Sequence, residues 1–328
     1  MQYKFCHQLK NSLFFANGDI LHCCSSTENA APKFKINYNG EHFDKNLIIE
    51  EKQAAAQKSK GKIIPFAACK DCHQYEKREW DNDFRIKDIS ISHWTACNCN
   101  CFYCYTAKNK TFFNTKQPYK LLPILEDIKD IIDFNGIVRF IGGDIAMLDE
   151  FEDIVDFFLK NGCKNFYIPT SGIKYVSTVA NLLKQGIAHV IISTDSATEA
   201  SYKKIKQVNC FDSVKQNIIK YNEAANEGNS IFELKYIIIP NINDSKEEIK
   251  KWLDMCTSIN VNNIAIDFET NFLKDKPTEI PAHIPDLVKY IHKKAEDNNM
   301  NICNFTYLSQ LLFGLKNGLY KLKGKNNV

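Results

Sequence analysis

The sequence lacks a long hydrophobic run. No window of its 328 residues approaches the roughly 20 apolar residues that a helix needs to cross a bilayer, so we expect no transmembrane segment. The first residues, MQYKFCHQLKNSLFF, carry only a brief apolar run and no small-residue cleavage site, so we expect no signal peptide. Both absences predict a cytoplasmic protein.

The sequence also lacks a marked excess of charge. Its 42 basic and 39 acidic residues give a formal net charge of +3, which is too small to indicate binding to nucleic acid or to an anionic membrane. It has no repeat of fixed period and no low-complexity tract. With 44% hydrophobic and 25% charged residues, the composition is that of an ordinary folded chain, so disorder is not expected.

Cysteine, in contrast, is abundant. The chain has 13 cysteines, and four of them fall within the stretch HWTACNCNCFYCY at residues 93–105. In a reducing compartment, clustered cysteines bind metals or take part in catalysis more often than they form disulfides. An odd number also argues against complete pairing. The sequence therefore predicts a metal-binding or catalytic role for the clustered cysteines.

From about residue 85 onward, strand-like and helix-like stretches alternate. This order predicts βα units around a parallel sheet, in an α/β fold with a partial (β/α)6 TIM-like barrel. In such a barrel the chemistry lies at the carboxyl ends of the strands. The predicted strands are residues 85–92, 136–142, 165–170, 189–194, 232–240 and 262–269. The predicted helices are residues 121–134, 150–160, 175–185, 211–227, 245–258 and 284–298.

Residues 1–80 differ in character, with five cysteines and short strand-like pieces. We expect a hairpin turn at residues 17–19 and a helix that starts after the N-cap Asp44 and is stopped by Gly61 as its C′ residue. Residues 76–85 look like a charged connector. The predicted domains are a small N-terminal α+β domain over residues 1–80, the barrel over residues 81–300, and a C-terminal tail over residues 301–328 that packs on the barrel.

Cys97, Cys101 and Cys104 form a C-x3-C-x2-C pattern directly after the first predicted barrel strand. Three thiolates on a short loop can hold one [4Fe–4S] cluster and leave its fourth iron open to a substrate. The alternative is a zinc knuckle completed by Cys99 or His93. The spacing allows both, and the position at the catalytic rim of a barrel favours the cluster.

The loop resembles the cysteine motif of the radical S-adenosylmethionine (radical SAM) superfamily, because CNCNCFYC is similar to the family's frequent CNLxCxYC. The resemblance implies a [4Fe–4S] cluster on Cys97, Cys101 and Cys104, with S-adenosylmethionine bound to the open iron. It also implies that S-adenosylmethionine is cleaved reductively to a 5′-deoxyadenosyl radical that abstracts hydrogen from a substrate. Tyr103 is then expected near the adenine.

Later stretches are similar to other motifs of the family. RFIGGD resembles GGE with Asp144 in place of Glu, IPTSG resembles TNG with Ser171 in place of Asn, and IISTDS resembles SxDG. Such hydroxyl and carboxylate groups also serve as helix caps. NIND resembles the family's NxxD stretch, but we favour a turn at Asn241 and an N-cap at Asp244. The resemblance implies that S-adenosylmethionine is bound by Tyr103, Gly142, Gly143, Asp144, Ser171, Ser193 and Asp195.

The N-terminal cysteines suit a site with four thiolates, for which structural zinc is the alternative. The block resembles the twitch or SPASM module of radical SAM enzymes, although that module normally follows the barrel. The resemblance implies one auxiliary [4Fe–4S] cluster, and the Gly-x4-Cys register favours Cys23 over Cys24 as a ligand. The expected ligands are Cys6, Cys23, Cys69 and Cys72.

The sequence therefore predicts a radical SAM enzyme with two [4Fe–4S] clusters and S-adenosylmethionine as cofactors. We expect an oxidoreductase-like dehydrogenation of a sugar or alcohol, or the modification of a peptide, on a small-molecule or peptide substrate. The expected electron donor is a reductant such as flavodoxin or ferredoxin. The alternative is a non-enzymatic interaction protein that binds zinc or a cluster.

Overall fold

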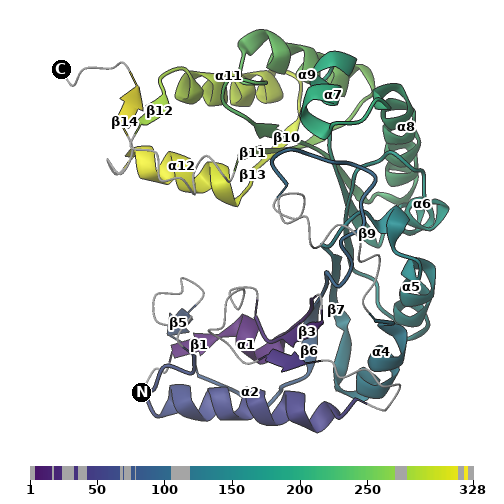
Figure 1. Cartoon of the computed structure of the whole chain (residues 1–328), viewed down its shortest axis with the longest axis vertical. Coiled ribbons are helices and arrows are strands. Elements are labelled where there is room, and N and C mark those ends of the chain that lie inside the picture. The colour runs from purple at the N-terminus through teal and green to yellow at the C-terminus, as the bar shows by residue number, and fades with distance from the viewer. Residues whose placement is uncertain are drawn as a thin grey trace. The chain divides into compact units, whose positions relative to one another are not determined.

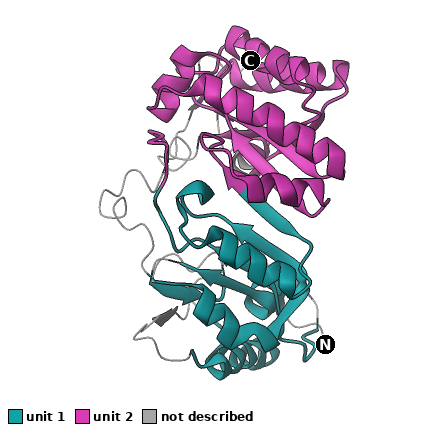
Figure 2. Ribbon diagram, turned by 90° about the vertical axis from the view of Figure 1, so that its right-hand side faces the viewer, with its two compact units in different colours: residues 1–96, 114–168 teal, residues 97–113, 169–328 magenta. Residues whose placement is uncertain are grey.

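The computed structural model (Figure 1) describes residues 4–16, 18–23, 33–35, 43–66, 69, 75–77, 79–104, 119–269, 279–316 and 321–323. The chain divides into two compact units, which Figure 2 shows in different colours. Unit 1 comprises residues 1–96 and 114–168, and unit 2 comprises residues 97–113 and 169–328.

The sheet of unit 1 is built around β6, whose side chains are almost all buried. β6 pairs in parallel with β7 on one side and with β2 on the other, and β7 pairs in parallel with β8. β2 and β3 are antiparallel partners, which confirms the predicted N-terminal hairpin, and β3 pairs with β4. The bounds are β2 Ser12–Phe15, β3 Asp19–Leu21, β4 Lys33–Lys35, β6 Ile86–Ile91, β7 Ile132–Phe140 and β8 Phe166–Thr170.

β7 passes very close to β6 where the register of the two strands shifts, between Ile86 and Asp88. Gly136 lies at this point, and a Cβ atom there would come within 2.0 Å of the carbonyl oxygen of Lys87. Glycine is therefore the residue that allows the two backbones to approach. The helices of unit 1 are α1 His7–Asn11, α2 Lys45–Lys60, α4 Leu122–Ile128 and α5 Phe151–Lys160.

Helix α2 begins where the sequence predicts. The carboxylate of Asp44 accepts a hydrogen bond from the backbone N–H of Asn46 (3.0 Å), as an N-cap does. The helix ends at Lys60, but Gly61 has an ordinary φ of −75°, and the left-handed residue is Lys62 with φ 62°. The stop therefore lies one residue later than expected.

The segment expected to be a connector is part of the N-terminal packing. β5 (Tyr75–Lys77) pairs antiparallel with β1 (Lys4–Cys6). The buried Trp80 ring packs edge-on against the Phe5 ring, with 5.1 Å between the ring centroids. The Asn11 amide also donates to the carbonyls of Asp83 (3.2 Å) and Arg85 (2.7 Å). Residues 79–85 are thus held against the first helix.

Unit 2 has a parallel sheet in the order β9, β10, β11, β13. Its strands are β9 Ala188–Ser193, β10 Ile231–Ile238, β11 Asn263–Phe268 and β13 Asn301–Asn304. Its helices are α6 Ser177–Lys184, α7 Glu199–Lys206, α8 Phe211–Gly228, α9 Lys246–Ser258, α11 Ile284–Asp297 and α12 Thr306–Lys316. A short parallel pair joins β12 Glu279–Pro281 and β14 Lys321–Lys323.

The predicted fold class is confirmed, because the six predicted strands are separated by helices along the chain and pair in parallel, β6 with β7, β7 with β8, β9 with β10 and β10 with β11. All six strands predicted for the barrel are present, and five of the six helices predicted for the barrel lie close to their expected bounds. The exception is residues 121–134, where α4 ends at Ile128, a 3-10 turn spans Lys129–Ile131, and β7 begins at Ile132. Helix α7 and strand β13 were not predicted.

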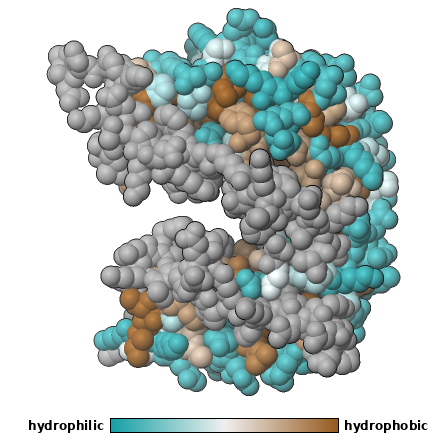
Figure 3. Space-filling model, viewed as in Figure 1, coloured by the Kyte–Doolittle hydropathy of each residue, from teal (hydrophilic) through white to brown (hydrophobic). Residues whose placement is uncertain are grey.

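Among the described residues, no helix is both long enough and apolar enough to cross a membrane. In the view of Figure 3, the described surface is mostly hydrophilic and its hydrophobic side chains lie in small separate groups. Single exposed residues such as Leu47 and Phe313 are normal on a folded protein.

Candidate functional site

The cysteine loop follows β6, as predicted, and its four cysteines belong to unit 2. Cys97 is exposed, whereas Cys99, Cys101 and Cys104 are half-buried. The backbone N–H of Cys104 donates to the carbonyl of Cys101 (3.0 Å), and that of Cys99 contacts the sulfur of Cys97 at 3.4 Å. The loop is therefore a series of tight turns that brings the thiols near one another.

Helix α7 holds this loop from its C-terminal end. The backbone N–H of Asn100 donates to the carbonyl of Lys206 (3.0 Å), and that of Phe102 donates to the carbonyl of Ile205 (3.3 Å). The Asn100 amide also donates to the side chain of Gln207 (2.8 Å), the left-handed residue that ends the helix. The last carbonyls of a helix have no partner within it, so they are free to bind another segment.

A buried group of polar side chains lies beside the loop. The Tyr103 hydroxyl donates to Asp195 Oδ2 (2.6 Å), and the Lys206 ammonium donates to both the Tyr103 oxygen (2.8 Å) and Asp195 Oδ2 (2.5 Å). The side chains of Lys206 and Asp195 are only 4% and 0% exposed. Tyr103 itself is half-buried. We call Tyr103, Asp195 and Lys206 the polar triad.

Asp195 is fixed from several directions at the end of β9. Its backbone has φ 55°, which is left-handed, and its Oδ1 accepts a hydrogen bond from the backbone N–H of Ile237 (2.8 Å). The Asn243 amide donates to its carbonyl (2.9 Å). Both carboxylate oxygens therefore have partners within the protein. The expected contact between Asp195 and S-adenosylmethionine remains a prediction.

The charges of the triad affect the thiols. A hydrogen bond from Cys99 and the positive charge of Lys206 lower the pKa of Cys101 to about 6, although burial and Asp195 oppose this. Hydrogen bonds with Cys101 and Cys97, together with burial, raise the pKa of Cys99. Of these two hydrogen-bonded thiols, Cys101 is therefore the more acidic.

Burial lowers the pKa of Lys206, but the negative charge of Asp195, with a further contribution from Cys101, outweighs this effect and raises that pKa. Burial also raises the pKa of Tyr103, and the charge of Asp195 adds to this effect. The triad is therefore a neutral tyrosine between a cation and an anion.

Two further predicted residues lie in unit 2. The Ser171 hydroxyl, after β8, donates to the side-chain oxygen of Asn98 (2.8 Å), so this turn contacts the cysteine loop. Ser193 is the last residue of β9 and is half-buried. Their expected contacts with S-adenosylmethionine remain predictions.

The predicted Gly-Gly-Asp motif lies in unit 1, after β7. The backbone N–H of Gly143 donates to the carbonyl of Trp94 (2.9 Å), and that of Asp144 donates to the carbonyl of Ala96 (3.0 Å). The Trp94 indole N–H donates back to the carbonyl of Asp144 (2.9 Å). The Asp144 carboxylate accepts from Ala146 N–H (3.0 Å) as the N-cap of a 3-10 turn. The motif therefore fixes the segment that leads to the cysteine loop.

We expect Gly143→Ala to lower the free energy of unfolding by about 3 kcal/mol, because overpacking of this kind costs typically 1–3 kcal/mol and the obstacle is backbone. A Cβ atom at Gly143 would lie 2.1 Å from the carbonyl oxygen of Ala96. Gly61→Ala is the matched control, since Gly61 has φ −75° and its nearest atom would be 3.4 Å away. Chemical unfolding of both variants measures the difference, and equal stability would contradict the close approach.

Three of the four expected ligands of the auxiliary cluster belong to one hydrophobic cluster of unit 1. Cys6, Cys23 and Cys69 are buried in one cluster. The cluster also contains Phe5, Leu9, Ala56 and Trp80. Cys72 and the alternative Cys24 lie outside the described residues. Segments far apart in the sequence thus contribute cysteines to one core, and the auxiliary site remains a prediction.

A buried lysine lies close to these thiols. The Lys52 ammonium donates to the carbonyls of Leu9 (2.9 Å) and Ser12 (2.8 Å). Burial lowers the pKa of Lys52 to about 7, whereas the charges of Cys23 and Cys6 act to raise it. Burial also lowers the pKa of His22 to about 2, with a smaller effect of Lys52. The surroundings are apolar, and Lys52 is the cation next to the thiols.

The three cysteines of the loop are a donor set that fits an iron–sulfur cluster, whereas the N-terminal site remains a prediction. Among the described residues, no three Cys, His, Asp or Glu side chains converge closely enough to coordinate one metal ion. A [4Fe–4S] cluster is instead held by thiolates at its separate corners, so its ligands need not meet at one point. Cysteine sulfurs are the usual donors for such a cluster.

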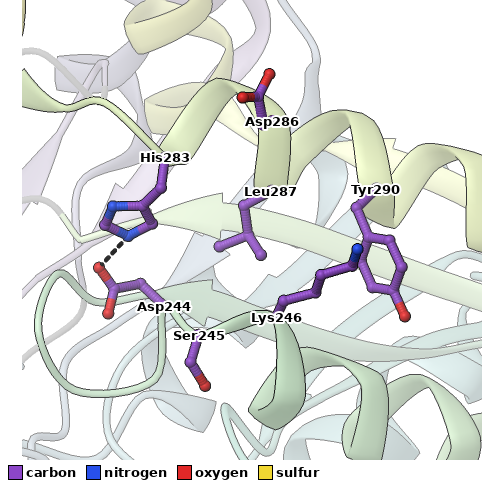
Figure 4. A pocket seen from close by; sticks show the side chains of 7 residues that line it. All are labelled: Asp244, Ser245, Lys246, His283, Asp286, Leu287 and Tyr290. Carbon is purple, nitrogen blue, oxygen red and sulfur yellow. Dashed lines mark hydrogen bonds and ion pairs between the residues drawn. The ribbon is translucent and has the colours of Figure 1, made fainter.

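A pocket of about 450 Å³ lies at the N-terminal ends of α9 and α11 (Figure 4). Asp244 and His283 face each other across one side of it and form an ion pair at 2.7 Å. The turn predicted at Asn241 is confirmed by its φ of 64°, but the N-cap of α9 is Ser245 and not Asp244. The Ser245 hydroxyl accepts a hydrogen bond from the backbone N–H of Glu248 (3.2 Å), whereas the Asp244 carboxylate contacts His283.

Comparisons with known proteins agree with the fold and the loop. The family model described as the radical SAM superfamily matches residues 91–256. GTP 3′,8-cyclase from Helicobacter pylori is 28% identical over 197 residues, which cover 58% of this chain and 59% of that protein. A probable GTP 3′,8-cyclase from Thermoplasma volcanium is 25% identical over 216 residues, 64% of this chain and 63% of that protein. The chain thus spans less than two thirds of the length of these relatives.

Solved structures show the fold. SuiB from Streptococcus suis bound to S-adenosylmethionine has a TM-score of 0.53 at 14% identity, covering 80% of this chain and 57% of that one. SuiB bound to the precursor peptide SuiA has a TM-score of 0.53 at 12% identity, covering 95% and 75%. The family match spans half of the sequence and includes the cysteine loop. The chain therefore belongs to the radical SAM superfamily, which implies a [4Fe–4S] cluster and S-adenosylmethionine as its cofactors.

Proposed function

We propose that Cys97, Cys101 and Cys104 hold the [4Fe–4S] cluster of a radical SAM enzyme that abstracts hydrogen from its substrate. One observation carries this proposal: the three cysteines lie on one loop that follows β6, and α7 holds this loop by backbone hydrogen bonds to Asn100 and Phe102. When bound and reduced, the cluster supplies the electron that cleaves S-adenosylmethionine to a 5′-deoxyadenosyl radical.

The other predicted residues have supporting roles in this proposal. Gly142 and Gly143 let the backbone after β7 approach Trp94 and Ala96, the segment that leads to the cysteine loop, while the carboxylate of Asp144 acts as a cap. Their contact with S-adenosylmethionine remains part of the proposal. Tyr103, Ser171 and Ser193 remain the side chains that we propose for contact with S-adenosylmethionine. For Asp195 we propose that it acts mainly through Tyr103 and Lys206, since both of its oxygens already accept hydrogen bonds.

We also propose an auxiliary [4Fe–4S] cluster on Cys6, Cys23, Cys69 and Cys72, in a module like the twitch or SPASM domain. The common burial of Cys6, Cys23 and Cys69 supports it. Four thiolates leave no open iron, so a cluster there suits electron transfer rather than substrate binding. A purely structural cluster or zinc ion is the alternative, because metals also stabilise small domains.

For the substrate, we propose a small molecule or a peptide, with dehydrogenation of a sugar or alcohol and peptide modification as the two reactions. The names of the sequence relatives add a nucleotide to the small molecules worth testing, and SuiB was solved with a precursor peptide. A soluble reductant such as flavodoxin or ferredoxin is the proposed electron donor, and the cytoplasm is the proposed location.

The proposal is tested on the wild-type protein purified without oxygen. We expect about eight iron atoms per chain, as two four-iron clusters imply, and release of 5′-deoxyadenosine when dithionite and S-adenosylmethionine are added. Iron and zinc are measured by elemental analysis, and the nucleoside by chromatography. A colourless protein with stoichiometric zinc and no 5′-deoxyadenosine would instead favour the non-enzymatic zinc-binding alternative.

A further inference from the structure

Lys206 is a buried cation whose role the cysteine pattern does not explain. Its side chain is 4% exposed, and its ammonium group bonds to Asp195 Oδ2 at 2.5 Å and to the Tyr103 oxygen at 2.8 Å. Burying a charged pair costs free energy through desolvation, so a pair of this kind is weak evidence for a stabilising role alone. Its position beside the cysteine loop suggests a role in the chemistry of that loop.

The cation acts on the cysteine loop in two ways. The backbone carbonyls of Ile205 and Lys206 accept hydrogen bonds from the loop, which fixes the end of α7 next to it. The ammonium group also lies 5.3 Å from the centre of the Tyr103 ring, and Tyr103 is next to Cys104 and two residues from Cys101 in the chain. The Asp195 carboxylate accepts the hydrogen bond of the Tyr103 hydroxyl, so a cation and an anion both lie at this part of the loop. Charges in a buried environment interact more strongly than charges in water.

We propose that Lys206 is a positioning residue that raises the reduction potential of the cluster held by the cysteine loop, and that Asp195 lowers the same potential. The inference rests on the proposed cluster ligands. One-electron reduction adds a negative charge to a cluster, here with dithionite as the electron source. A buried cation nearby stabilises the reduced form, and a buried carboxylate destabilises it. Nearby charge and hydrogen bonding are known to tune such potentials.

The test compares three variants in a redox titration followed by electron paramagnetic resonance, using the cluster signal that S-adenosylmethionine perturbs. Lys206→Gln is expected to lower the reduction potential by at least about 59 mV, which corresponds to a tenfold less favourable one-electron reduction. Asp195→Asn is expected to shift the potential upward. Lys204→Gln is the matched control, because Lys204 is an exposed lysine on the same helix, and its potential should equal that of the wild type.

Opposite shifts separate an electrostatic role from a structural one, since loosening of the loop would move both variants in the same direction. Equal potentials in Lys206→Gln and the wild type, or a downward shift in Asp195→Asn, would overturn the inference. If Lys206→Gln does not retain the cluster, the other two variants test the inference. Lys206→Arg keeps the positive charge and should have the wild-type reduction potential, whereas Asp195→Asn should have a higher one. A wild-type protein without any cluster signal would overturn the proposed function together with this inference, whereas a normal wild-type signal with unshifted variants overturns the inference alone.

Discussion

Replacing Cys101 with alanine is expected to abolish the release of 5′-deoxyadenosine and to remove about four of the iron atoms, the content of one cluster. Cys101 is the loop cysteine whose pKa is lowered to about 6, by the hydrogen bond from Cys99 and by the charge of Lys206. Its sulfur is one of the three that hold the proposed cluster, so its loss leaves a second iron atom without a protein ligand. Iron content and product chromatography on the anaerobic variant measure both effects.

Two other cysteines serve as controls for this variant. Cys303 is exposed on β13 and should be replaceable by alanine without change in iron or product. Cys99→Ala is the sharper comparison, because the zinc-knuckle alternative uses Cys99 as a ligand and the proposed cluster does not. Loss of all the loop-bound metal in Cys99→Ala, or normal turnover in Cys101→Ala, would refute the ligand assignment.

Replacing Cys69 with alanine is expected to lower the iron content from about eight to about four atoms, because the auxiliary cluster loses one of its thiolates. Cys69 is buried with Cys6 and Cys23 in the cluster that also contains Trp80. Loss of a metal that joins these segments should also lower the thermal stability of unit 1. Cleavage of S-adenosylmethionine should persist, since it depends on the other cysteines.

Cys163→Ala is the matched control for the auxiliary site, as Cys163 is a buried cysteine of the same unit. Burial raises the pKa of Cys163, so it is expected to remain a thiol and to bind no iron. An iron content near eight in both variants would show that Cys69 binds no cluster. A content near four in the wild type, unchanged in Cys69→Ala, would point to the same conclusion.

The strands could be predicted from the sequence because each is a short apolar run bounded by polar or turn residues. Residues 121–134 show where this fails. Ile128, Ile131 and Ile132 follow helical spacing, but Ile132 pairs with Ile86 in the parallel sheet, and this long-range partner decides the local structure. Helix α7 escaped prediction because its buried side chains are few, although Thr198 caps it by accepting from Ser201 N–H.

The candidate site was only partly predictable for a related reason. The spacing of Cys97, Cys101 and Cys104 is local, so it can be read directly from the sequence. The partners of the loop are not local: Tyr103 and Asp195 are 92 residues apart, and Lys206 lies on the helix that was missed. A lysine in a charged helix gives no sign that its side chain is buried. Only the fold identifies it.

The parallel pairing of β2 with β6 has a practical consequence for anyone who wishes to express the barrel by itself. A cut after residue 80 would remove β2, which supplies backbone partners to Ser90 and its neighbours along β6. The exposed strand edge would then be open to pairing with other molecules, and aggregation would follow. The boundary between the two predicted domains is therefore a poor place to shorten the gene.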